Sequence, residues 1–131
     1  MTPTPSIDDL TWVFEDEPVP ENPDGPIPGG GTLDWRRDWP FTSVTFRSVR
    51  GDDVVELGIN PGYEWVSITV SRRGEPVLTV ETGDVQTVQI ERLHGREEVH
   101  VTFRQPRVEM LRLVMKPAVS LHWRVLRSVS R

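Results

Sequence analysis

The chain has 131 residues, no cysteine and a formal net charge of −5. This length suits one domain, and the missing cysteine excludes disulfides, thiolate nucleophiles and the commonest structural zinc sites. Because we find no secretory signal at the first residues and no apolar run that could span a membrane, we expect a protein of a reducing cytoplasm, or of a particle assembled there.

Residues 1–40 are expected to form a flexible acidic arm. Eight of the 12 prolines lie in this stretch, and residues 1–34 hold eight acidic side chains with no lysine or arginine. Residues 41–131 hold 13 basic and 11 acidic side chains, so the acidity belongs to the arm. The prolines and consecutive glycines of residues 18–31 are typical of a linker.

An apolar segment, residues 6–17, interrupts this arm. As a helix it would begin at Ser6, a good N-cap, with Asp9 in the first turn; as a strand it would align alternate apolar side chains. The sequence leaves both forms open, because so short a segment is marginal alone in either. We predict that it docks a partner through its apolar side chains, which are Ile7, Leu10, Trp12, Val13 and Phe14. The alternative is that the segment docks on the chain's own body, whose net positive charge complements the acids of the arm.

Residues 41–131 are expected to form about eight short strands joined by short turns, without a helix. The clearest strand is residues 63–72, in which Val66, Ile68 and Val70 alternate with polar side chains. Short turns favour antiparallel neighbours, so we predict an antiparallel β-sandwich, with a small closed β-barrel as the alternative. Trp123 shares its phase with apolar neighbours and is expected in the core. Since every alternating strand follows Phe41, residues 41–131 are expected to fold without the arm.

No catalytic motif is present. The chain lacks a phosphate-binding loop, the zinc-protease HExxH pattern, a nucleophile elbow and a dinucleotide-binding glycine motif. The paired acids, Asp52-Asp53 and Glu97-Glu98, sit in or beside turns, where they are interpreted as solubilising residues. We expect no enzyme activity, no cofactor and no metal. Nucleic acid is also an unexpected partner, because the body is nearly neutral and the arm is acidic.

Two groups of polar-phase residues are candidate ligand sites. His100 and His122 fall on the polar phase of their strands with several arginines, a set that suits a carboxylate or phosphate. A solvated polar face is the favoured interpretation, because antiparallel sheets normally keep one. Aromatic side chains on the outer face of strand 63–72 would suit sugar rings, but the favoured interpretation is that they pack under the arm or against a neighbouring strand. The candidate ligand residues are Tyr63, Trp65, His100, Arg104, His122 and Arg124.

These features favour a non-catalytic protein-interaction or assembly module, whose N-terminal arm docks a partner or a neighbouring subunit. A structural component of a virion and a toxin-neutralising protein both fit this description. The alternative is a β-module that binds carbohydrate through Tyr63 and Trp65, or an anion through the His100 and His122 face.

Overall fold

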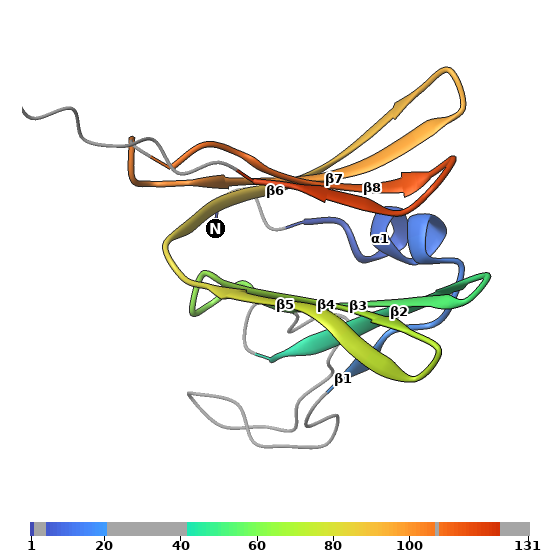
Figure 1. Ribbon diagram of the computed structural model, residues 1–131. Coiled ribbons are helices and arrows are strands. Elements are labelled where there is room, and N and C mark those ends of the chain that lie inside the picture. Colours follow the sequence, from blue (N-terminus) through green and yellow to red (C-terminus); the bar gives the residue numbers. More distant parts are fainter. Residues whose placement is uncertain (2–4, 21–41, 107, 124–131) are drawn as a thin grey trace, which may run out of the picture.

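Two antiparallel sheets face each other in the structure, a computed structural model that describes Met1 and residues 5–20, 42–106 and 108–123 (Figure 1). Strand order follows the sequence in both sheets, so each sheet is a meander. The turn between β5 and β6 connects the first sheet to the second. The sheets do not close into a barrel, which confirms the predicted all-β sandwich.

Within the described residues the first sheet has five strands and the second has four. The first holds β1 (Val19–Pro20), β2 (Val44–Arg50), β3 (Asp53–Asn60), β4 (Trp65–Arg72) and β5 (Glu75–Thr82). The second holds β6 (Val85–Leu93), β7 (Arg96–Phe103), β8 (Leu111–Lys116) and β9 (Ser120–His122).

Tight turns join the two strands of the β4–β5 hairpin and of the β6–β7 hairpin. Between β4 and β5, Arg73 and Gly74 have φ values of 52° and 82°, and between β6 and β7, His94 and Gly95 have 49° and 80°. Two consecutive residues with positive φ match the right-handed twist of the flanking strands. The turn chemistry therefore sets the register of both hairpins.

The core lies between the sheets and follows the period-two pattern of the strands. Val66 and Ile68 are fully buried and Val70 is 8% exposed, as the alternation predicts. From the opposite sheet, Val99 and Leu113 pair in register and are fully buried.

One helix, α1 (Ile7–Phe14), lies between the two layers at one end of the sandwich (Figure 1). The Ser6 side chain accepts a hydrogen bond from the Asp9 backbone N–H at 3.2 Å, and Glu15 ends the helix in the left-handed conformation. After the helix, β1 pairs with β2.

Residues 5–20 therefore belong to the folded body, and the expected boundary near residue 41 is corrected. The expectation of a flexible linker over residues 21–40 lies outside the described residues. In the part of the chain that the structure describes, no helix has the length and apolar character needed to cross a membrane.

Candidate functional site

The predicted docking segment is packed into the protein's own core. Leu10 and Val13 are fully buried and Phe14 is 1% exposed, with the Phe14 ring centroid 5.9 Å from that of Phe46. These three side chains are not available to a partner in this folded state, which corrects the idea of an exposed apolar cluster. The helix buries them because the end of the sandwich offers an apolar opening that an amphipathic turn fills.

Two residues of that segment remain accessible. Ile7 is only partly buried, and Trp12 is 53% exposed on the outer side of α1. The Arg92 guanidinium carbon lies 3.8 Å from the centroid of the Trp12 ring, a cation–π contact, and an Arg92 amino group lies 3.3 Å from the Asp9 carboxylate. A contact within the chain thus accounts for the exposed tryptophan.

Charged side chains from both sheets hold the C-terminal end of α1. Lys116 Nζ lies 2.8 Å from Glu15 and 3.2 Å from Glu97, and Arg50 donates a hydrogen bond of 2.8 Å to the Val13 carbonyl. Hydrogen bonding to Glu15 first, and then to Glu97, raises the pKa of Lys116 above its ordinary value. The same pairing lowers the pKa of Glu15.

A register shift explains how Lys116 reaches the helix. Pairing between β7 and β8 shifts between Glu97 and Glu98, so that Lys116 faces the same side as Glu97 while Val114 faces the same side as Glu98. Beyond such a bulge, the side chains of the strand point to the opposite face of the sheet from the one that simple alternation gives. The bulge therefore takes Lys116 from the outer face to the inner one.

The candidate sugar-binding aromatics lie together at one end of the first sheet. Tyr63 is 84% exposed in the β3–β4 turn, where its backbone N–H donates to Asn60 Oδ1 at 3.1 Å. Trp65 is half-buried at the start of β4 and lies over Gly58. A shallow hollow of about 450 Å³ is lined by both aromatics, with Ser43, Asn60 and Gly83.

The two candidate histidines lie in one row across the second sheet. His100 pairs in register with Arg112, and Arg112 pairs with His122, so all three side chains face outward from β7, β8 and β9. The sequence pattern placed these histidines on one face, and the register agrees with that.

The other two members of the predicted set are not brought into this row. Arg104 turns to Glu64, with its Nε 2.8 Å from Glu64 Oε2, and the N-terminal ammonium of Met1 lies 2.8 Å from the same oxygen. Hydrogen bonds from the N-terminus and then from Arg104 hold the pKa of Glu64 below its usual range. Arg124 lies outside the described residues.

Glu98 occupies the centre of the outer face and connects its cations. Its carboxylate lies 2.9 Å from Arg96 Nε, 2.9 Å from His100 Nε2 and 3.6 Å from Arg112 Nε. The hydrogen bond from His100, together with the nearby arginines, lowers the pKa of Glu98 although burial opposes this shift. Glu98 is only 8% exposed, so the solubilising role expected for it is corrected.

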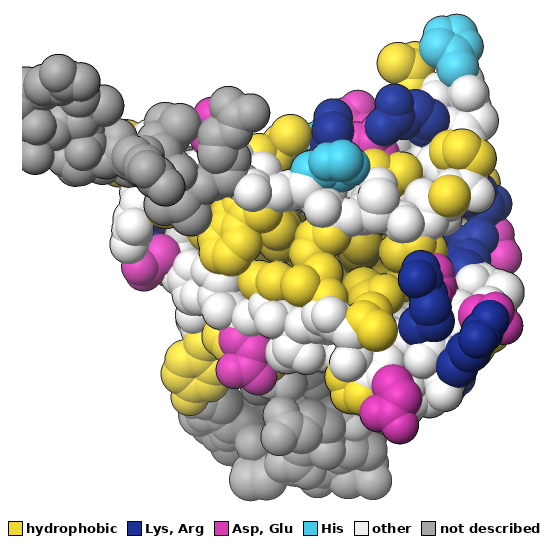
Figure 2. Space-filling view, viewed as in Figure 1, with side chains coloured by type: hydrophobic (Ala, Val, Ile, Leu, Met, Phe, Trp, Pro, Cys, Tyr) yellow, Lys and Arg dark blue, Asp and Glu magenta, His cyan; other side chains and the backbone are white. Residues whose placement is uncertain are grey.

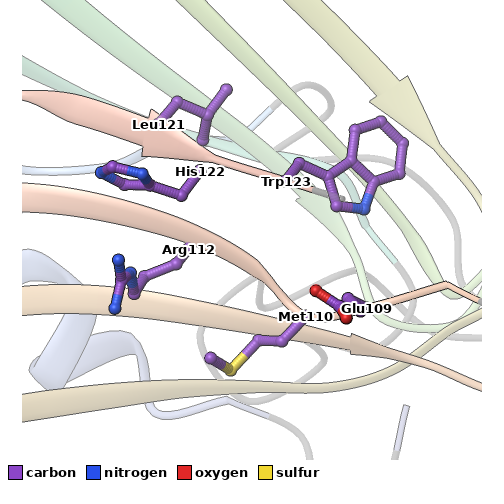
Figure 3. A pocket seen from close by; sticks show the side chains of 6 residues that line it. All are labelled: Glu109, Met110, Arg112, Leu121, His122 and Trp123. Atoms are coloured by element: carbon purple, nitrogen blue, oxygen red, sulfur yellow. The ribbon is translucent and has the colours of Figure 1, made fainter. Parts of the chain in front are cut away.

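A groove opens beside this face, where β8 begins and β9 ends (Figure 3). Its volume is about 690 Å³, and Figure 3 shows Arg112 and His122 together at one side and Trp123 at the other. We call it the Trp123 groove; it is lined by Glu109, Met110, Arg112, Leu121, His122 and Trp123.

Trp123 is the residue that sequence reasoning placed wrongly. It was expected in the core, but it is 42% exposed and stacks on Phe103 with ring centroids 5.8 Å apart. Figure 2 shows that hydrophobic side chains also reach the surface between the two layers. The alternation correctly gave the inward phase of Trp123, but it carried no information on how far the opposite sheet extends.

Among residues 5–20, 42–106 and 108–123, no group of three or more histidine, aspartate or glutamate side chains is arranged to hold a metal ion. What the surface offers is an apolar groove with a cationic wall, and a separate pair of aromatics.

The fold and these surfaces define an antiparallel β-sandwich with an N-terminal helix inserted between its sheets. No family model matches the chain, and no curated protein matches it. A solved structure is similar: a chain of a contact-dependent growth inhibition toxin–immunity protein complex from Klebsiella pneumoniae 342. It has a TM-score of 0.70 and 14% sequence identity, over 92% of this chain and 93% of that chain. At this identity the likeness concerns the fold.

Proposed function

We propose that this chain is a non-catalytic, protein-binding module of the toxin-neutralising kind. The observation that carries the proposal is the similarity, over nearly the full length of both chains, to a chain of a toxin–immunity protein complex. The sequence alone also favours a protein-interaction role. The exposed groove with its tryptophan and arginine supports a protein partner, because these residue types are enriched where partners bind most strongly.

Growth protection is the direct test. The tagged full chain is used to capture proteins from the organism that encodes it, and each captured protein is then expressed alone and together with this chain. We expect one captured protein to arrest growth alone and to be harmless in the presence of the chain.

Two variants serve as controls for that assay. Ile68→Asp places a carboxylate in the fully buried core and should abolish protection by unfolding the chain. Arg47→Gln changes an exposed side chain of β2 and should protect like the parent. Captured proteins that are all harmless alone, or toxic whether or not the chain is present, would overturn the proposal.

The second candidate function is carbohydrate binding at Tyr63 and Trp65, favoured by the exposure of Tyr63 beside the half-buried Trp65. Titration with cellohexaose and chitohexaose should then change tryptophan fluorescence, and Tyr63→Ala should remove the change. Fluorescence that is unaltered by either sugar at millimolar concentration would leave this candidate without support.

A further inference from the structure

Three basic side chains on the outer face of the second sheet converge on a single carboxylate. One carboxylate, Glu98, is shared by Arg96 and His100 at 2.9 Å each and by Arg112 at 3.6 Å. At 3.6 Å the Arg112 contact is an ion pair without a hydrogen bond, and Arg112 Nε is buried without a hydrogen-bond partner. Arg112 is therefore the cation of this cluster whose hydrogen-bonding capacity is least satisfied.

Arg112 Nε itself is out of a partner's reach, but the rest of the Arg112 side chain is accessible from outside. Its side chain is 38% exposed and lines the Trp123 groove beside His122. A carboxylate, Glu109, also lines the groove and has an interaction of its own. A guanidinium presents a planar set of donors that fits a carboxylate with two parallel hydrogen bonds.

The floor of the groove is apolar and partly rigid. Met110 and Trp123 are 39% and 42% exposed, and Leu121 is half-buried between the core and the groove. Stacking on Phe103 fixes the Trp123 ring before any partner arrives. A pre-ordered aromatic loses little conformational entropy on binding, which is why such residues serve as anchors.

From this juxtaposition we propose that the Trp123 groove binds an acidic segment of a partner protein, with an apolar side chain against Met110 and Trp123 and a carboxylate at Arg112. The proposal rests on the proposed function for its class of partner, a protein. The net charge of −5 belongs to the whole chain and does not set the local charge of the groove, because interactions between exposed charges are largely screened beyond about 10 Å at 0.1 M salt.

A random library of 12-residue peptides displayed on phage tests this specificity without a known partner. Selection on the full chain should enrich peptides that carry aspartate or glutamate within two or three residues of a large apolar side chain. Synthetic peptides from the enriched set are then titrated against the parent, Arg112→Gln, Trp123→Ala and Arg47→Gln. Arg47→Gln makes the same chemical change as Arg112→Gln, but on the other sheet.

We expect Arg112→Gln and Trp123→Ala each to weaken binding by about tenfold or more, a difference of about 1.4 kcal/mol, while Arg47→Gln binds like the parent. Replacing the peptide's acid by its amide should weaken binding to the parent but should have little further effect on Arg112→Gln. Circular dichroism and melting temperature show that each variant is folded.

Three results would overturn the proposal: no enriched peptide, enriched peptides without acidic residues, or peptides that bind the groove variants as tightly as the parent. Sodium acetate that displaces the peptide at equal concentration would assign the groove to small anions instead. Because the library contains no toxin, failure here leaves the growth-protection test untouched, and loss of growth protection leaves the peptide result standing.

Discussion

Truncating Phe14 tests whether α1 is part of the core. Phe14 is 1% exposed and its ring packs beside that of Phe46 at 5.9 Å. Replacing a fully buried phenylalanine by alanine removes its apolar burial and leaves a cavity, at a cost of about 3–5 kcal/mol. With an unfolding entropy of about 2.1 cal/mol/K per residue, a loss of about 4 kcal/mol lowers the Tm of a chain of 131 residues by about 15 °C.

The assay is equilibrium unfolding in urea, followed by far-UV circular dichroism, together with scanning calorimetry of the same samples. Trp12→Ala is the matched control, since it lies on the same helix but is 53% exposed. It loses the cation–π contacts with Arg92 and Lys116, each about 0.5–1 kcal/mol at an exposed site. If Phe14→Ala unfolds within about 0.5 kcal/mol of the parent, α1 does not contribute to the core and the burial argument is refuted.

Three further predictions follow from the same structure. Deleting residues 1–16 should give a molten or insoluble chain, because it opens the core at Phe14; a cooperative melt close to that of the parent would contradict this. Val66→Asp should cost several kcal/mol, since Val66 is fully buried, whereas Thr69→Asp on the outer face should change the free energy of unfolding far less; similar melting temperatures would show that the faces are wrongly assigned. The folded-state pKa of Glu98 is lowered, so its carboxylate stabilises the protein above its ordinary pKa of about 4.3, and this contribution is lost as the pH falls through the folded pKa. Glu98→Gln should therefore be destabilising at pH 7, and the difference in unfolding free energy from the parent should shrink as the pH falls below about 4.3. A difference of constant size in urea titrations across this pH range would count against this.

The strands and their faces were predictable because period-two alternation is a local signal. Val66, Ile68 and Val70 point inward as predicted, and the row of His100, Arg112 and His122 agrees with the polar phase of three strands. For these residues, whose strands form regular ladders, the phase is enough to assign a face.

The placement of residues 6–17 was not predictable in the same way. Ser6 and the first-turn acids indicated a helix, but nothing local distinguishes a helix that docks elsewhere from one that fills its own sandwich. That choice depends on an apolar opening formed by strands far along the chain, next to Lys116 and Arg50. Lys116 itself faces inward only because of a bulge, which no alternation pattern encodes.

The meander arrangement of the two sheets has a consequence for how the chain acquires its structure. Strand pairings within a sheet join neighbours in sequence, so apart from the β1–β2 pairing they form through short loop closures. The contact of the helix with Arg92 is of another order, since it spans a separation of 83 residues. Contacts of such separation slow folding, because loop entropy is lost before they form. During synthesis α1 emerges before the strands of the sandwich, yet its pocket is complete only after β8 has emerged. A segment made before the strands would then be among the last to take its place.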